Sequence, residues 1–519
     1  NDGVVPKAGN QGGIISQFER EKMAEYHLEL APGAREKVFI QKFYLYLNMT
    51  KPSERLYVTF CRVNSDGKAL RRSYLIGTLL KLFPQLVVEE PSEEETLEGV
   101  LTAESALPFL IEGLNKPVED EEAWTALLAW YLSDEGDREK ALQLFDAAFG
   151  VHQDDAISKA VTKALYGNTL DNSVTRLEQF AACAFAHFLQ YGMKLTERVE
   201  YEFKPMDMGN VMHEALESFA EEVRKRGMKW TELTEQERNE IADRCLDNIV
   251  ADYGNTVLKS SARNEYMIER TRRILRRTVW ALQKQLEQGE FQPEGFEVTF
   301  GGGRIDRVDI MEDQNKVYVK VIDYKTGNTS FDLVYLYHGL QLQLMIYLDG
   351  ALRVEQKKYP DKEIIPAGVF YYNIKDPMIQ EKIDADVEAV SAGLMKELKM
   401  NGLVQADPEL VYRMDSSLGS IPVAFNKDGN FRKNSSVADR TQFAVLGRYV
   451  RTKIEKIRSS ILEGDAEVSP YELGKKNACT YCPYMTVCGF DRRLSGYEFR
   501  RLKNFSDEEL WKAFDREAE

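Results

Sequence analysis

The chain has 519 residues, 43% of them hydrophobic and 29% charged, and carries a formal net charge of -16. This length predicts about two to four domains. This excess of negative charge argues against a protein that simply coats nucleic acid. The sequence contains no run of about 18 apolar residues, so no membrane-spanning helix is predicted. The opening NDGVVPKAGNQGG has neither a methionine nor a secretory signal, which suggests a piece of a longer, cytoplasmic protein.

The elements are predicted in chain order from the spacing of apolar residues. Residues 1–90 mix basic loops with two strand-like runs, EKVFIQKFYLYLNM and ERLYVTFCRV. The acidic stretch EEPSEEETLEG then predicts a boundary. Apolar side chains at three- and four-residue spacings predict helices within 91–167. Further helices are expected over 176–192, 208–226, 234–253 and 263–288, before LEQGEFQPEG begins a region of strands.

Residues 296–327 carry the most informative pattern, two strand-like runs on either side of the polar turn MEDQNK. This pattern predicts a β-hairpin. Because side chains alternate along a strand, Asp323 and Lys325 share one face at the end of the second run. On the first run Asp306 and Asp309 face opposite sides. Pairing of the two strands would bring Asp306 beside Asp323.

Two converging carboxylates and a lysine are suited to metal-assisted hydrolysis of a phosphodiester. Oxygen ligands hold Mg²⁺ or Mn²⁺, and the ion lowers the pKa of a bound water and neutralises charge on the phosphate. A hairpin with solvated charges fits the same residues. His213, on the amphipathic stretch MGNVMHEALESFAEEV, is either a metal ligand or a structural histidine. Gln343 and Tyr347, at i and i+4 on one helix face, either pack or serve the site.

In this order, the blocks GNVMHEAL, GGGRIDRVD, VIDYKTG and GLQLQLMIYLD resemble the motifs of the RecB-like branch of the PD-(D/E)xK nucleases. The resemblance implies an α/β fold with helices on both sides of a mixed sheet. It implies that Lys325 orients or activates the attacking water, that Gln343 and Tyr347 support the site and contact DNA, and that the products carry a 3′-hydroxyl and a 5′-phosphate. The implied ligands of Mg²⁺, or of Mn²⁺ or Ca²⁺ in its place, are His213, Asp306, Asp323 and the backbone carbonyl of Tyr324.

Three of the six cysteines stand in CTYCPYMTVC near the end of the chain. Clustered cysteines in a reducing compartment more often bind metal than form disulfides. From spacing alone, zinc with His187 as a spare ligand, an iron-sulfur cluster and buried free thiols all remain open. The family resemblance favours a 4Fe-4S cluster that staples the fold, because a subset of these nucleases has one such cysteine before the nuclease core and three after it. The implied ligands are Cys183, Cys479, Cys482 and Cys488, which leaves Cys61 and Cys245 as ordinary thiols.

The whole chain resembles the C-terminal half of the AddB family of bacterial helicase-nuclease subunits, as in NDGVVPK, IISQFEREKM and PAGVFYYNIKDPMI. The resemblance implies part of a superfamily 1 helicase-like lobe over 1–90, a helical segment over 91–167 and the nuclease with its cluster over 168–519. The sequence contains no GxxxxGK[ST] phosphate loop. Translocation would belong to an AddA-type partner in a heterodimer that processes double-strand ends for recombinational repair in the bacterial cytoplasm.

An acidic chain needs local basic surfaces to hold DNA. Arg270, Arg273 and Arg277 are predicted either to follow the phosphates of a single strand from an unwound end or to form a solvated helix face. Two other functions stay open, a catalytically silent scaffold that recognises a hotspot sequence and an iron-sulfur redox sensor. The intact acidic, lysine and histidine set favours the nuclease over the scaffold. The 295-residue gap between the first two cluster cysteines favours a structural staple over a sensor.

Overall fold

The computed structural model divides the chain into two compact units, Asn1–Glu135 and Gly136–Glu519. Two helices that the sequence grouped with residues 91–167, α6 (Arg138–Phe149) and α7 (Lys159–Tyr166), belong to the second unit. The predicted boundary stretch 89–99 lies outside the described residues except for its first position, and the three-part division stays a prediction. The structure describes residues 5, 15–28, 30–64, 68–89, 102–115, 118, 120–149, 151, 156–168, 170, 173–198, 205–253, 261–301, 303–379 and 386–518.

The described part of the first unit consists of helices and loops. Its helices are α1 (Gln17–Glu25), α2 (Ala34–Thr50), α3 (Tyr74–Leu82), α4 (Ala103–Asn115) and α5 (Glu121–Ser133). The two strand predictions are wrong, because EKVFIQKFYLYLNM lies in α2 and ERLYVTFCRV forms only a single bridge from Val63 to Ala69. Aromatic and β-branched residues suggested strands, but α2 runs for 17 residues, longer than ordinary strands. The Glu36 carboxylate accepts a bond from the Gly33 N–H at 2.7 Å and caps this helix.

A six-stranded mixed sheet forms the centre of the second unit. Its order is β1 (Gln292–Phe300), β2 (Gly303–Asp313), β3 (Lys316–Lys325), β4 (Glu363–Asn373), β5 (Asn401–Gln405) and β6 (Val437–Ala438). The strands β3 and β4 are parallel, as are β5 and β6, and the other neighbours are antiparallel. Parallel neighbours need a crossover, which here contains α13 (Leu333–Tyr337) and α14 (Gln343–Lys358). The predicted hairpin and the predicted mixed α/β fold are therefore confirmed.

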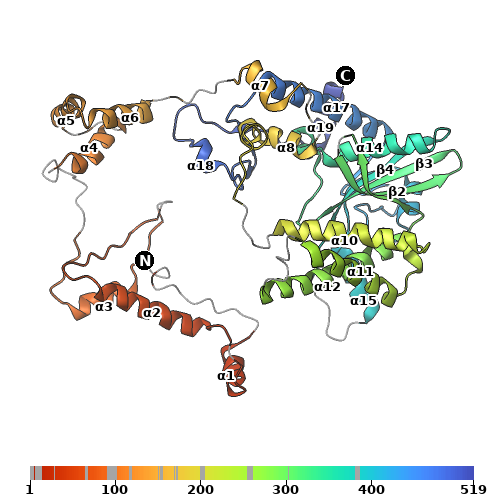
Figure 1. The fold of residues 1–519 in the computed structure, drawn as a ribbon, viewed down its shortest axis with the longest axis horizontal. Coiled ribbons are helices and arrows are strands. Elements are labelled where there is room, and N and C mark those ends of the chain that lie inside the picture. The colour runs from red at the N-terminus through yellow and green to blue at the C-terminus, as the bar shows by residue number, and fades with distance from the viewer. Residues whose placement is uncertain are drawn as a thin grey trace. The chain divides into compact units, whose positions relative to one another are not determined.

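Helices cover both faces of the sheet (Figure 1). A bundle of α10 (Pro205–Lys225), α11 (Glu235–Asp252) and α12 (Ala262–Glu287) lies on one face, and α8 (Val174–Ala182), α14 and α17 (Arg440–Glu463) lie on the other. The two-residue period of β3 accounts for both layers, because Tyr318 and Ile322 pack toward the α10–α12 bundle whereas Val319 and Val321 pack toward α14 and α17.

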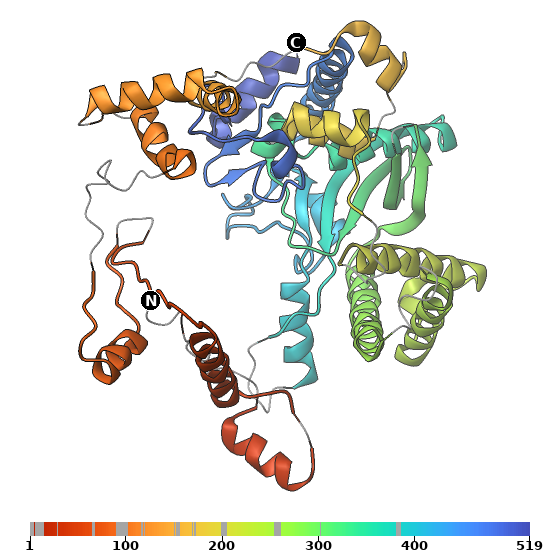
Figure 2. The same cartoon turned by 60° about the vertical axis from the view of Figure 1, so that its left-hand side comes forward.

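The helices predicted over 208–226, 234–253 and 263–288 correspond to α10, α11 and α12 and are confirmed. The prediction over 176–192 corresponds to α8, α9 (Ala184–His187) and a π-helical turn, η2 (Phe188–Gly192). None of the described helices is both long and apolar enough to span a membrane. The remaining elements, several of them visible in Figure 2, are η3 (Trp230–Glu232), α15 (Val387–Glu397), α16 (Pro408–Met414), β7 (Tyr471–Leu473), β8 (Lys476–Asn477), α18 (Met485–Cys488), β9 (Arg500–Arg501) and α19 (Asp507–Ala518).

A buried ionic network fixes the register of β2 against β3. The carboxylate of Asp309 accepts two bonds from the Arg307 guanidinium, at 2.5 and 2.9 Å. Its second oxygen lies 2.9 Å from the Lys320 ammonium, and Asp309 and Lys320 are register partners across the hairpin. Removing one member of such a network would leave an unpaired buried charge, so a slipped register is strongly disfavoured. The network lies on the face opposite Asp306.

Candidate active site

Two aspartates meet where β2 and β3 pair. The pairing of Arg307 with Ile322 places Asp306 and Asp323 across from each other at the next position. Asp306 is 8% exposed and Asp323 is 1% exposed. Burial and the charge of Asp306 raise the pKa of the Asp323 carboxyl to about 7. The structure therefore brings together two carboxyl groups that repel each other while both are ionised.

The backbone of Tyr324 holds Asp306 in place. The Tyr324 N–H donates to Asp306 Oδ2 at 2.7 Å. Its ring points away from the aspartates, into the core with the α10–α12 bundle, where it is 2% exposed. The ring of Tyr324 thus anchors β3 in the core while its main chain contacts the site. Metal binding by the Tyr324 carbonyl stays a prediction.

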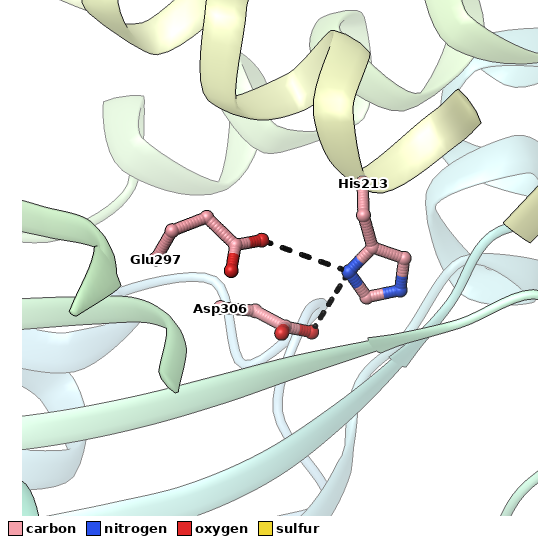
Figure 3. Close-up of side chains that lie close together, drawn as sticks. All are labelled: His213, Glu297 and Asp306. Atoms are coloured by element: carbon pink, nitrogen blue, oxygen red, sulfur yellow. Dashed lines mark ion pairs between the residues drawn. The ribbon is translucent and has the colours of Figure 1, made fainter. Parts of the chain in front are cut away.

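His213 points from α10 toward Asp306 and Glu297 (Figure 3). Its Nδ1 lies 3.3 Å from Asp306 Oδ2 and 3.9 Å from Glu297 Oε1. Burial favours the neutral ring, but the hydrogen bond and charge of Asp306 outweigh it and raise the pKa of His213. Val211, Leu216 and Phe219 on the same helix are buried in the core and fix the orientation of α10. The imidazole is therefore directed at the carboxylates.

Glu297 is a member of the site that the sequence did not reveal. It lies on β1 opposite Asp306, because Phe296 pairs with Arg307 and Val298 with Ile305. Burial and the Asp306 charge raise the pKa of Glu297 to about 7, and Arg304 pairs with it at 2.5 Å. Ligand atoms of Glu297, His213 and Asp306 all lie within 4.8 Å of one another. This spacing and this excess of negative charge suit a divalent cation with oxygen and imidazole ligands.

Lys325 ends β3 with its ammonium group beside the aspartates. Its Nζ lies 2.8 Å from Asp323 Oδ2 and donates to Gln343 Oε1 at 2.7 Å. Gln343 Nε2 in turn donates to the Tyr347 hydroxyl at 3.0 Å. The alternation along β3 and the i, i+4 spacing on α14 thus combine into one chain of contacts. Since the lysine side chain is 29% exposed, it can also reach a substrate.

Glu178 is the second site residue that the sequence reasoning missed. It lies on α8, and its Oε1 accepts bonds from the N–H groups of Leu342 and Gln343 at 2.7 and 3.0 Å. It therefore caps the start of the helix that carries Gln343. The signal was available, because Glu178 stands four residues after Val174 within the buried stripe of an amphipathic helix. A carboxylate in an apolar stripe is a candidate functional group.

Glu178 should make stability depend on pH. Burial raises its pKa from 4.5 to about 7, so the folded protein keeps a proton that the unfolded chain has lost. The resulting stabilisation is complete below about pH 4.5 and is lost as pH rises through about 7. Glu178→Gln has a neutral acceptor and no proton to lose. Between pH 4.5 and 7 its free energy of unfolding should therefore fall by about 3 kcal/mol less than that of wild type. Urea unfolding at a series of pH values measures this, with exposed Glu508→Gln on α19 as the control. Parallel curves for wild type and Glu178→Gln would contradict the prediction.

The four predicted cluster cysteines line one small pocket. Cys183 follows α8 and is 7% exposed, whereas Cys479, Cys482 and Cys488 come from the segment between β8 and α18 and from α18 itself. Burial and the three neighbouring thiols raise the pKa of Cys479 to about 11. All six cysteines of the chain are free thiols in the structure. Residues almost 300 positions apart in the sequence thus meet at one place.

His187, the spare ligand of the zinc alternative, is engaged elsewhere. Its Nε2 accepts a bond from Arg176 Nε at 3.1 Å. Its ring packs against three aromatic rings, those of Tyr166, Phe180 and Tyr191. It is fully buried, and burial lowers its pKa to about 3, so the ring is neutral. The structure therefore gives His187 a packing role apart from the thiol pocket.

The predicted DNA-binding arginines lie on α12, away from the hairpin. Arg270 and Arg273 are exposed, and Arg273 pairs with Asp376 at 2.6 Å. Arg277 is half-buried, with its guanidinium over the Trp280 ring. These contacts allow either of the two roles considered for them, and DNA binding by this helix stays a prediction.

Comparison with known proteins adds a family and several relatives. Residues 172–489 match the model of the PD-(D/E)XK nuclease superfamily. The full chain is 40% identical to a subunit of the ATP-dependent helicase/deoxyribonuclease of Lachnoclostridium phytofermentans and covers 47% of it. It is 32% identical to the proteins of the same name from Alkaliphilus metalliredigens and Clostridium acetobutylicum, each of which it covers to 48%. The chain thus spans about half the length of the curated relatives that it matches.

Proposed function

The chain belongs to the PD-(D/E)XK nuclease superfamily, and from this premise we propose that it is the metal-dependent deoxyribonuclease part of a helicase-nuclease subunit. The observation that carries the proposal is the contact of Lys325 with Asp323, at 2.8 Å, beside Asp306. A lysine and two buried carboxylates at one strand end form the set that phosphodiester hydrolysis needs. The names of the relatives support a deoxyribonuclease rather than a ribonuclease.

The residues of the site fit a divalent cation. Burial, and after it the charge of Asp306, raises the pKa values of the Asp323 and Glu297 carboxyl groups to about 7, so a bound cation would stabilise their ionised forms. When bound, Mg²⁺ lowers the pKa of a coordinated water and neutralises charge on the phosphate; Mn²⁺ or Ca²⁺ suits the same ligands. The proposed ligands are His213, Asp306, Asp323 and the backbone carbonyl of Tyr324, with Glu297 within reach of the same ion.

The protein's own groups position the reactants. Lys325 lies where it can donate to the attacking water and to a phosphate oxygen, and Gln343 holds its ammonium group from the other side. Tyr347 fixes Gln343 through the hydroxyl that accepts from its amide. Water attacks phosphorus in line, and the proposed products are a 3′-hydroxyl and a 5′-phosphate. Asp306 is held by the Tyr324 N–H and so stays aligned during turnover.

The four thiols are proposed to bind a 4Fe-4S cluster. Four cysteines around one pocket satisfy the ligand count of such a cluster, and the engagement of His187 with Arg176 removes the spare ligand of the zinc alternative. The cluster would tie the segment after α17 to the end of α8. Its role would then be structural rather than catalytic.

The partner and substrate of the whole assembly are also proposals. The relatives are named as one subunit of an ATP-dependent helicase/deoxyribonuclease, which supports an AddA-type partner that unwinds duplex ends and delivers a single strand. The chain has no phosphate loop of its own. We place this activity in the bacterial cytoplasm, in the repair of double-strand breaks.

Cleavage of an end-labelled DNA single strand by anaerobically purified protein tests the function. We expect cleavage with Mg²⁺, none with EDTA, and a loss of at least about 10³-fold in Asp323→Ala, which keeps DNA binding within a few-fold. The exposed variant Asp515→Ala on α19 controls for removal of a carboxylate. If wild-type protein with its partner and ATP failed to cleave, a DNA-binding scaffold would replace the nuclease.

A further inference from the structure

A groove lies along α14 between Ile346 and Lys357. Its walls are α14 and α17, which lie next to each other (Figure 1), and Thr299 and Phe300 at the end of β1 add to its lining. The groove has a volume of about 770 Å³. Apolar side chains, among them Phe300, Ile346 and Ile454, form part of its lining. It is therefore a built concave surface with an aromatic ring in its wall.

Basic side chains predominate along this groove. Four cations face two carboxylates there, although the chain as a whole has a net charge of -16. Local positive charge in an acidic protein indicates an anionic ligand. The cations are Arg353, Lys357, Arg451 and Arg458, and the carboxylates are Asp349 and Glu455.

Two of these cations, Arg353 and Arg451, stay available to a ligand despite their ion pairs. Arg353 pairs with Asp349 at 2.7 Å, but its side chain is 66% exposed. Arg451 is 57% exposed and lies 3.9 Å from the same carboxylate. Exposed pairs of this kind contribute little to stability. A phosphate can therefore replace Asp349 as the partner of either arginine.

Side-chain contacts connect the lining of the groove to the catalytic residues. The Phe300 ring meets the Tyr347 ring edge to face, with 5.9 Å between centroids. Tyr347 contacts Gln343, and Gln343 contacts Lys325. Leu177, the neighbour of Glu178, also lines the groove. Two side chains, those of Tyr347 and Gln343, thus separate the groove lining at Phe300 from the catalytic lysine.

The dimensions suit a single strand of nucleic acid. From Tyr347 to Lys357 the helix rises about 15 Å, and Arg353 and Lys357 are one turn apart. Proteins that hold single strands combine a positively charged track for phosphates with aromatic rings for bases. On the basis of the proposed function, we propose that this groove binds the DNA single strand next to the cleaved phosphodiester, with Arg353 and Arg451 on its phosphates and Phe300 under a base.

The test measures binding of a labelled DNA single strand of about 16 nucleotides as a function of salt. All proteins carry Lys325→Ala, so that Mg²⁺ is present without turnover. Replacing Arg353 and Arg451 by alanine should lower the slope of log K against log salt by about 1.4, since each lost contact on a single strand removes about 0.7. Affinity at low salt should fall at least tenfold. Replacing both by lysine should keep the slope.

The control is Arg226→Ala, directly after α10, which removes an i, i+4 pair like that of Arg353 but lies outside the groove. It should bind as the parent protein does. An unchanged slope in the double alanine variant would overturn the proposal that the groove binds DNA. Cleavage by the wild-type protein would still support the nuclease proposal. If the parent Lys325→Ala protein bound no single strand, the proposed role of the groove would also be wrong. The cleavage assay on wild-type protein then tests the nuclease proposal separately.

Discussion

Lys325→Ala protein should lose DNA cleavage by at least about 10³-fold, because the lysine ammonium group contacts Asp323 and is held by Gln343 where it can reach the reacting phosphate. Single-strand binding should stay within a few-fold of wild type, since the loss removes one of several cationic contacts. The measurement is a single-turnover rate with saturating protein, which separates cleavage from binding. A loss of rate without loss of affinity is the signature of a group that acts on the reacting phosphate.

A matched lysine provides the control for this variant. Lys362 precedes β4, is 29% exposed like Lys325 and pairs with Glu312 at 2.7 Å. Lys362→Ala should cleave at the wild-type rate. Lys325→Arg keeps the charge but changes the geometry of the donor, so it should recover only part of the activity. Equal rates for Lys325→Ala and Lys362→Ala would remove the lysine from the mechanism.

Local sequence patterns were sufficient to predict the β2–β3 hairpin and the nuclease family. Alternation along β3 placed Asp323 and Lys325 on one face, and the structure and the superfamily match agree with the predicted fold and family. Glu297 escaped because β1 shifts register between Pro293 and Gly295 and Glu297 has a positive φ of 49°. Neither the bulge nor the strained residue leaves a periodic trace in the sequence. Its proximity to Asp306 could therefore not be predicted.

Glu178 escaped for a different physical reason. Its two hydrogen bonds join positions 164 and 165 residues apart, so no local window contains both partners. The wrong strand prediction over α2 is the opposite case. The residue types there favour a strand, but the segment is long and is capped by Glu36, and it forms a helix. Intrinsic strand preference depends strongly on context. Contacts between distant segments, rather than local preference, complete this site.

Cys482→Ala protein should lose the brown colour and the iron of the wild-type protein, because three thiolates cannot satisfy the cluster. A link from Cys183 to the C-terminal cysteines closes a loop of almost 300 residues. If the entropy relation for disulfides carries over, this closure stabilises the fold by about 5 kcal/mol. Absorption spectra and iron and zinc content, measured on protein prepared without oxygen, report the cluster directly.

The fold also predicts where the damage from Cys482→Ala should appear. Tyr449 on α17 and Phe514 on α19 are buried in the sheet core, so these helices should stay protected. The intervening residues 464–506 hold three short strands and the thiol pocket, and limited proteolysis should cut there. Cys245→Ala removes a buried thiol from α11 without touching the pocket and should keep both colour and protection. A colourless wild type with one bound zinc would instead show that the same four thiols form a tetrahedral site, since zinc needs only four ligands around one ion.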